Sequence, residues 1–234
     1  MCGIFGVISK NSVNKQSLQL LVNHARQRGR DSSGLIFKQV KSCQVKRADY
    51  DIKTLLSKVK PYSSTFVLGH SRLITNGLGD NQPIVRGDVL VIHNGIIVND
   101  DAVWETLGTK RLFKIDSEVI AAITELHLKS GEDLSLLSDA VLGQCKGTIS
   151  TAVVLPKLGK VVLFSNNGSL YIGSNEEAFY FSSESYPLTQ LDCKGIQQIK
   201  EQAYIVDIPV CDVIQVSDES TRKEDLIPEF KYIK

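Results

Sequence analysis

The sequence predicts an α+β domain in which β-sheets pack against a few helices. Two observations favour this fold class: strand-like runs dominate the second half of the chain, and amphipathic helical segments separate the strands of the first half. The 234-residue chain shows no internal repeat and no linker rich in Pro or Gly. A chain of this length can bury one sizeable core, so we expect a single domain.

The first half opens with an apolar run at Gly3–Ser9, which predicts a strand. Apolar residues then recur at helical spacing from Leu18 to Ala25, and Gly29 suits the end of that helix. The further expected elements are strands at 33–38, 42–48, 65–72 and 88–93, and helices at 99–107, 117–129 and 133–142. The order of the strands does not follow from propensity.

The second half turns mostly to short strands, joined by turns such as Asn166-Asn167-Gly168. The expected strands are at 148–155, 160–165, 169–172, 178–182, 196–200, 204–208 and 212–216. The last stretch is polar and has no clear period. We therefore expect a domain over residues 1–216 and a tail over residues 217–234 that is a candidate docking segment.

The amino-acid composition indicates which binding partners and which cellular compartment to expect. The 27 basic and 26 acidic residues give a net charge of +1, without the basic excess typical of nucleic-acid-binding proteins. No apolar run approaches the roughly 18–20 residues that a membrane span needs, and the N-terminus lacks a secretory pattern. The five cysteines are widely spaced and form no C-x-x-C pair, which is typical of a reducing compartment. We expect a cytoplasmic protein that binds neither nucleic acid nor membrane.

The first candidate for chemistry is Cys2. If Met1 is removed, Cys2 carries a free α-amine with a pKa near ~8 beside a thiol with a pKa near ~8.5. The amine can then act as general base for the thiol of the same residue. Taken alone, Met-Cys is also common by chance, and such a cysteine is then a small hydrophobic residue at the start of a strand.

Two further segments bring polar groups to the ends of predicted elements. The turn that begins at Arg28 and Gly29 either borders a small-molecule pocket or is simply a helix end followed by a polar loop. Arg72 ends an apolar strand, where a guanidinium needs an anionic partner such as a carboxylate. That carboxylate belongs either to a ligand or to another residue of the chain.

Asn94, Gly95 and Asp116 also have two interpretations each. Asn94-Gly95 after a strand is typical of a hairpin turn, but an Asn amide beside a Gly N–H can also donate two hydrogen bonds to one oxyanion. Asp116 suits the N-cap of the helix that follows, and a carboxylate there can also bind an ammonium group. His70 and His93 have no acidic or thiol partner at metal-ligand spacing, so we expect no metal site.

The order of these segments resembles a known family. Cys-Gly-Ile-Phe-Gly at the N-terminus is followed by Arg-Gly-x-Asp-Ser-Ser-Gly, Gly-His-Ser-Arg-Leu, His-Asn-Gly-Ile-Ile and Asp-Ser-Glu-Val-Ile. This series resembles the class II glutamine amidotransferases, which are N-terminal nucleophile hydrolases. The family includes the glutaminase domains of asparagine synthetase, glucosamine-6-phosphate synthase and amidophosphoribosyltransferase. The resemblance covers residues 2 to about 210.

The resemblance implies a fold and a set of roles. The fold is a four-layer αββα sandwich with Cys2 at the end of a central strand. Cys2 would attack the side-chain amide of L-glutamine and form a γ-glutamyl thioester, and Asn94 and Gly95 would stabilise the oxyanion. Arg72 would bind the α-carboxylate of the substrate and Asp116 its α-ammonium. Thr75, Arg28 and Gly29 would line the pocket, and no cofactor or metal is implied.

The sequence differs from the pattern of the family that it resembles at several points. After Arg72 it continues Leu73-Ile74-Thr75-Asn76, which is closer to asparagine synthetase than to the sugar synthases. Family members normally carry a synthase domain that consumes the ammonia, whereas this chain ends at Lys234. We therefore expect a separate synthase subunit as ammonia acceptor. The alternatives are a free-standing hydrolase of γ-glutamyl amides and a non-catalytic glutamine-sensing or scaffold subunit.

Overall fold

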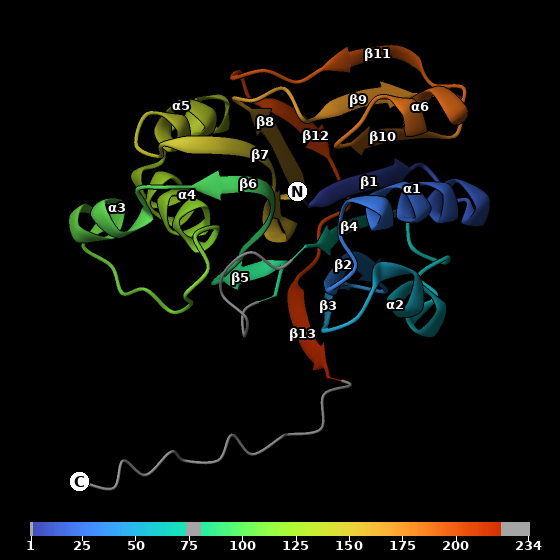
Figure 1. Ribbon diagram of the computed structural model, residues 1–234, viewed down its shortest axis with the longest axis horizontal. Coiled ribbons are helices and arrows are strands. Elements are labelled where there is room, and N and C mark those ends of the chain that lie inside the picture. The colour runs from blue at the N-terminus through green and yellow to red at the C-terminus, as the bar shows by residue number, and fades with distance from the viewer. Residues whose placement is uncertain (1, 74–80, 221–234) are drawn as a thin grey trace, which may run out of the picture.

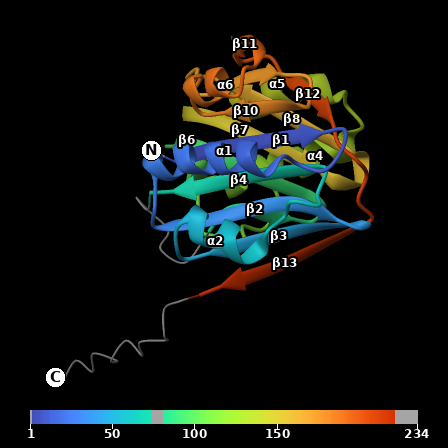
Figure 2. The ribbon, with the colours of Figure 1, turned by 90° about the vertical axis from the view of Figure 1, so that its right-hand side faces the viewer.

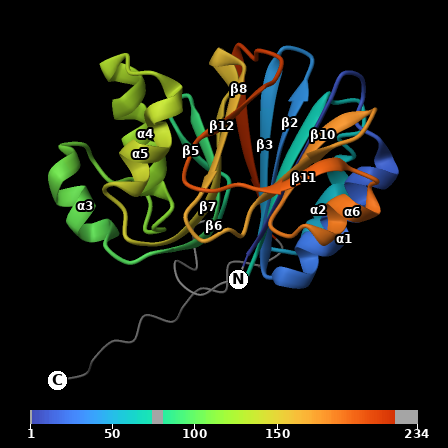
Figure 3. The same ribbon diagram turned by 90° about the horizontal axis from the view of Figure 1, so that it is seen from above.

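The computed structural model describes residues 2–73 and 81–220. Two β-sheets pack face to face, and helices cover the outer surface of each sheet (Figure 3). The order of the layers is therefore helices, sheet, sheet, helices. This arrangement confirms the expected α+β fold class and the four-layer αββα sandwich.

The first sheet carries both the N-terminal and the last described strand (Figure 1). Its order is β11 (Lys194–Gln198), β9 (Tyr171–Ser174), β10 (Ala178–Ser182), β1 (Gly3–Ser9), β4 (Phe66–Arg72), β2 (Ser32–Gln39), β3 (Ser42–Ala48) and β13 (Val213–Glu219). All neighbours pair antiparallel except β3 and β13, which are parallel. The strand β1 thus lies in the middle of the sheet, and β13 lies at one edge (Figure 2).

The second sheet is smaller and wholly antiparallel. Its order is β12 (Tyr204–Asp207), β8 (Lys160–Ser165), β7 (Gly147–Leu155), β6 (Val89–Ile97) and β5 (Ile84–Arg86). Its central strands β7 and β8 are rich in Val and Leu, residues that suit a sheet buried on both faces.

Helices α1 (Lys15–Arg28), α2 (Ile52–Val59) and α6 (Tyr186–Gln190) cover the first sheet. Helices α3 (Asp100–Leu107), α4 (Glu118–Ser130) and α5 (Leu137–Leu142) cover the second. Short 3₁₀ turns lie at η1 (Leu134–Leu136) and η2 (Pro156–Leu158). The side chain of Asn14 caps α1 by accepting from the backbone N–H groups of Gln16 and Ser17.

Three apolar clusters fill the spaces between the layers. The central cluster joins inner-face residues of both sheets, such as Ile4 and Leu68 of the first and Ile92 and Val154 of the second. The other two lie between each sheet and its helices. Alternate residues of each strand enter opposite clusters, so the pleat decides which side chains point between the sheets.

Most expected elements are present, with a few differences. The structure adds α2, α6 and β5, which were not expected, and it extends β6 from the expected 88–93 to Ile97. The strand β13 continues to Glu219, so the expected boundary between residues 216 and 217 falls inside a strand. The backbone pairing with β3 keeps this polar stretch extended as part of β13. Residues 221–234 of the expected tail lie outside the described residues.

The N-cap assignment of Asp116 is wrong. Helix α4 begins at Glu118 and its N-cap residue is Ser117. The Asp116 carboxylate instead accepts hydrogen bonds from the backbone N–H groups of Ile97 and Ser117, at 2.8 and 2.9 Å. The carboxylate therefore joins the end of β6 to the residue that precedes α4.

In the described part of the chain, no helix combines the length and the apolar character that crossing a bilayer requires.

Candidate active site

Cys2 lies immediately before β1, at one end of the central strand of the first sheet. Its carbonyl oxygen accepts a hydrogen bond from Arg28 Nε at 2.8 Å. A second nitrogen of the same guanidinium donates to Glu184 at 2.6 Å, so Arg28 is held from both sides. The last residue of α1 thus fixes the backbone of Cys2.

Arg72 ends β4, the neighbour of β1, and its side chain is buried. The turn after α1 packs directly on it. A Cβ placed on Gly29 would lie 2.3 Å from the carbonyl carbon of Arg72, and Ser71 Oγ donates to the Gly29 carbonyl at 2.8 Å. Only glycine allows this close approach. Arg28, Gly29 and Arg72 are therefore brought together beside Cys2.

The electrostatic surroundings of the Cys2 thiol include two of the other expected site residues. Burial raises the pKa of this thiol above its usual range, and the negative charge of Asp116 adds to the rise. A hydrogen bond from the backbone of Leu73 and the positive charge of Arg72 lower the pKa of the thiol and so oppose the rise. The thiol therefore needs a base before it can act as a nucleophile near neutral pH.

Asn94 and Gly95 lie within β6, so the hairpin interpretation is wrong. Asn94 pairs with Ser150 and Gly95 with Ile149 of β7. Gly95 has a φ of +156°, and a Cβ placed on it would lie 1.8 Å from the carbonyl oxygen of Thr148. This contact with β7 is why the chain requires glycine here.

The alternation of β6 places the N–H of Gly95 on the side away from β7. Along a strand, the amides of every second residue point to the same side. The N–H of His93 donates to Gln82 Oε1 at 2.6 Å, and the N–H of Ile97 donates to Asp116 Oδ2 at 2.8 Å. The N–H of Gly95 lies between these two donors on the same edge of β6. The Asn94 side chain is buried.

The structure thus groups most of the expected residues. Arg72 and Asp116 act electrostatically on Cys2, Arg28 bonds to its backbone, and Gly29 packs on Arg72. The Asp116 carboxylate accepts a hydrogen bond from the N–H of Ile97, two residues after Gly95 in β6. Thr75 lies outside the described residues. The roles of all these residues stay predictions.

Sequence reasoning missed four residues that support this group. Glu184 anchors Arg28, and Ser183 Oγ accepts from the N–H of Ile4 at 2.9 Å. Gln82 and Ser117 bond to each other and to His93. Each partner is distant in sequence from the residue that it holds, so no local spacing indicated it. Among residues 2–73 and 81–220, no three His, Cys, Asp or Glu residues are grouped as metal ligands.

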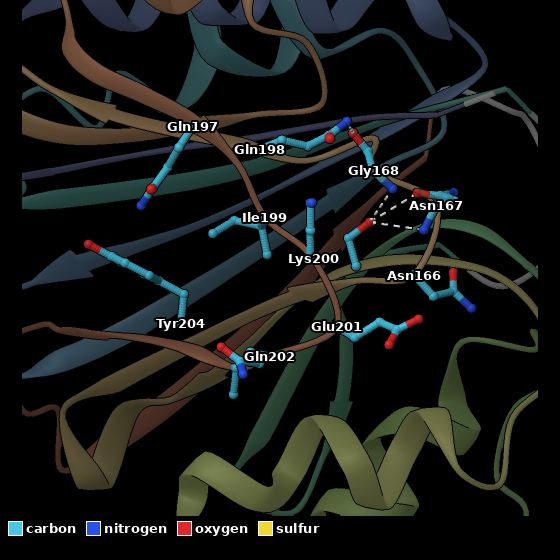
Figure 4. Close-up of a pocket in the computed structure, with 12 residues that line it drawn as sticks. Asn166, Asn167, Gly168, Gln197, Gln198, Ile199, Lys200, Glu201, Gln202 and Tyr204 are labelled. Atoms are coloured by element: carbon cyan, nitrogen blue, oxygen red, sulfur yellow. Dashed lines mark hydrogen bonds between the residues drawn. The ribbon is translucent and has the colours of Figure 1, made fainter.

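A separate cavity of about 800 Å³ lies between the β8–β9 turn and the segment that joins β11 to β12 (Figure 4). Gln198 spans it by donating to the Gly168 carbonyl at 2.7 Å. Asn167, one of the lining residues, accepts a hydrogen bond from Ser150 Oγ of β7 at 2.6 Å. The residues that line this cavity do not include Cys2, Arg72, Asn94 or Asp116.

The four-layer fold with Cys2 at the end of a central strand is the architecture of the N-terminal nucleophile hydrolases. The sequence profile of the glutamine amidotransferase domain family matches residues 70–190, just over half of the chain. The chain belongs to the glutamine amidotransferase domain family, a family of enzymes. The profile match begins after Cys2 and the Arg28-Gly29 turn.

Curated relatives agree with this assignment. The chain is 27% identical over 196 residues to glutamine–fructose-6-phosphate aminotransferase of Rhizobium meliloti, covering 80% of this chain and 32% of the relative. The same enzyme of Caulobacter vibrioides is 29% identical over 194 residues, covering 79% and 32%. The chain thus spans about a third of the length of these relatives.

Solved structures share the fold. Glutamine phosphoribosylpyrophosphate amidotransferase from B. subtilis superposes with a TM-score of 0.67 at 19% identity, covering 88% of this chain and 49% of that chain. A glutamine aminotransferase class-II domain protein from Silicibacter pomeroyi gives a TM-score of 0.55 at 12% identity, covering 88% and 99%.

Proposed function

We propose that the chain hydrolyses L-glutamine to L-glutamate and ammonia at Cys2. The observation that carries this proposal is the position of Cys2 at the end of β1, within electrostatic reach of Arg72 and Asp116. A guanidinium and a carboxylate beside one nucleophile suit an amino acid, whose α-carboxylate and α-ammonium need opposite charges. The family assignment supports glutamine as that amino acid.

The reaction divides into two steps. The Cys2 sulfur attacks the side-chain amide carbon of glutamine, the thiol proton passes by way of a base to the amide nitrogen, and ammonia leaves. A γ-glutamyl thioester remains on Cys2. Water then attacks the thioester carbon, and glutamate is released while the thiol regains its proton.

The base in this mechanism is the α-amine of Cys2 after loss of Met1. The buried histidines His70 and His93 are poor candidates for this base. Burial lowers the pKa of His70 to about 3, so its ring is too weak a base to hold a thiol proton. Both ring nitrogens of His93 lie within hydrogen-bond distance of other residues, Ser117 and Thr148.

The oxyanion of the tetrahedral intermediate is stabilised by the Asn94 side chain and the Gly95 N–H. The outward direction of that N–H, between two amides that already have partners, leaves it available to a ligand. Removal of one such donor typically costs about 3–4 kcal/mol of barrier. Arg72 binds the α-carboxylate of glutamine, Asp116 binds its α-ammonium, and Arg28 and Gly29 line the pocket.

The ammonia passes to a synthase subunit on a separate chain. The relatives are named for the transfer of an amino group from glutamine to fructose 6-phosphate. Ammonia released into water is protonated and is then no nucleophile, so transfer requires an acceptor site docked on this domain.

The test is glutamate release from glutamine by the purified chain, together with the mass of its N-terminal peptide. We expect loss of Met1 and Cys2-dependent glutamate release, with Cys2→Ala inactive. The control Cys145→Ala removes a buried cysteine of the helix-side cluster on the second sheet and should keep activity. Equal glutamate release by Cys2→Ala would contradict the proposal.

A further inference from the structure

His93 lies on the outer side of β6, between β7 and the start of α4. Its ring is buried. Nδ1 is 2.9 Å from Ser117 Oγ, and Nε2 is 3.2 Å from the carbonyl oxygen of Thr148. The ring therefore connects the strand that carries Asn94 and Gly95 with the loop that carries Asp116.

These contacts fix the tautomer of His93. A carbonyl oxygen only accepts hydrogen bonds, so Nε2 carries the hydrogen that it donates to Thr148. Burial lowers the pKa of His93, which keeps the ring neutral. In the neutral ring Nδ1 is then an acceptor, and the Ser117 hydroxyl donates to it.

The direction of the Ser117 hydroxyl matters for Asp116. Ser117 Oγ is 2.9 Å from His93 Nδ1 but 3.4 Å from Asp116 Oδ1. A hydroxyl has one hydrogen to donate, and the first distance is that of a good hydrogen bond whereas the second is that of a weak one. Gln82 Nε2 donates to the same Ser117 oxygen at 3.2 Å and so occupies one of its acceptor positions.

The Asp116 carboxylate consequently retains acceptor capacity. It accepts two backbone N–H groups, of Ile97 through Oδ2 and of Ser117 through Oδ1. A carboxylate has about four acceptor positions. With the Ser117 hydroxyl turned away, Oδ1 remains available to one further donor.

We infer that His93 is a positioning residue that draws the Ser117 hydroxyl away from Asp116 and so leaves Oδ1 open to the α-ammonium of glutamine. This inference rests on the proposed function, in which Asp116 binds that ammonium. Loss of the Nδ1 acceptor would free the Ser117 hydroxyl to rotate toward Oδ1, where it competes with the substrate.

The experiment measures ligand binding by calorimetry in the full chain with Cys2→Ala, which cannot turn over. The ligands are L-glutamine and glutaramate, which is glutamine without its α-amino group. His93→Asn places an amide oxygen near the position of Nδ1, whereas His93→Gln places its amide near Nε2. We expect His93→Gln to bind glutamine about tenfold more weakly and glutaramate unchanged, and His93→Asn to resemble the parent.

A second variant separates this role from a loss of structure. Adding Ser117→Ala to His93→Gln removes the competing hydroxyl and should restore most of the affinity for glutamine. Ser117→Ala alone should bind glutamine as the parent does. An equal loss of both ligands in His93→Gln, or no rescue by Ser117→Ala, would overturn the inference. Should His93→Gln not fold, a tenfold loss of glutamine binding in Ser117→Ala alone would overturn it.

The parent chain distinguishes this inference from the proposed function. If it binds glutamine and glutaramate equally, the assignment of Asp116 to the α-ammonium fails, and if it binds neither ligand, the proposed glutamine site fails; the inference fails in both cases. If it prefers glutamine but His93→Gln keeps that preference, the inference about His93 alone is wrong.

Discussion

At the scale of single residues, the site depends on glycines that permit close contact and on buried polar groups with fixed partners. Gly29 and Gly95 have no room for a side chain. Around them, Arg28 donates to the Cys2 carbonyl and to Glu184, and Asp116 accepts from the backbone of Ile97 and Ser117. The groups assigned to substrate binding are therefore positioned before any substrate arrives, which favours catalysis.

The first prediction concerns Gly95. We expect Gly95→Ala to abolish glutamate release and to destabilise the fold by about 2 kcal/mol or more, because the φ of +156° and the contact with Thr148 both oppose a side chain. Gly108→Ala is the matched control. Gly108 has a φ of +62°, but a Cβ placed on it would meet no atom of the described chain within 4 Å, so only the backbone strain applies. Urea unfolding of both variants tests this, and equal stability would contradict it.

At the scale of elements, sequence patterns predicted most strands because strict alternation and buried apolar runs are local signals. The helix α2 was missed although Ile52, Leu55 and Leu56 have helical spacing and Asp51 caps it. The strand β5 was missed because three residues carry no period. The end of β6 was mistaken for a turn because Asn-Gly is a strong hairpin signal.

The site was less predictable than the elements. The residue types came from the resemblance, whereas the contacts between them depend on tertiary packing. Arg28 donates to the backbone of Cys2, which is 26 residues away in the sequence, and to the side chain of Glu184, which is 156 residues away. The partners of His93 are 24 and 55 residues away. No pattern in one sequence encodes such pairs.

The second prediction concerns α4, which follows Asp116. The Glu118 carboxylate is fully buried, forms an ion pair with Arg86 at 2.6 Å and accepts from the backbone of Phe113. We expect Glu118→Ala to destabilise the fold by about 3–5 kcal/mol because it leaves the Arg86 charge buried and without this partner. Asp218→Ala breaks an exposed pair with Arg47 and should cost less than about 1 kcal/mol. Similar losses in the two unfolding curves would count against this account of α4.

At the scale of the whole molecule, the two sheets enclose polar groups as well as the apolar core. His70 of β4 is fully buried, and neither ring nitrogen makes a hydrogen bond of good geometry within the described chain. Burial and the positive charge of Arg72 lower the pKa of His70 to about 3. The packing of the sheets therefore requires a neutral imidazole at this position.

The third prediction is a pH dependence of stability. In the unfolded chain His70 binds a proton below a pKa of about 6.5, whereas in the folded chain it remains neutral down to about 3. The unfolded state thus binds more protons in this window, and stability falls as the pH falls from about 6.5 toward 3, by up to about 1.4 kcal/mol per unit. We expect His70→Leu to reduce this slope. Urea unfolding at pH 7 and pH 5 measures it, and an unchanged slope would contradict the role of His70.

The central claim is that Cys2 is the nucleophile of a glutamine site, and covalent labelling tests it most directly. The purified chain is treated with a glutamine analogue that carries an electrophilic diazoketone, and the labelled peptides are mapped by mass spectrometry. We expect one label per chain, on Cys2 of an N-terminus without Met1, and protection by L-glutamine. A label on Cys43, Cys145, Cys193 or Cys211 instead, or no label at all on a chain that has lost Met1, would contradict it.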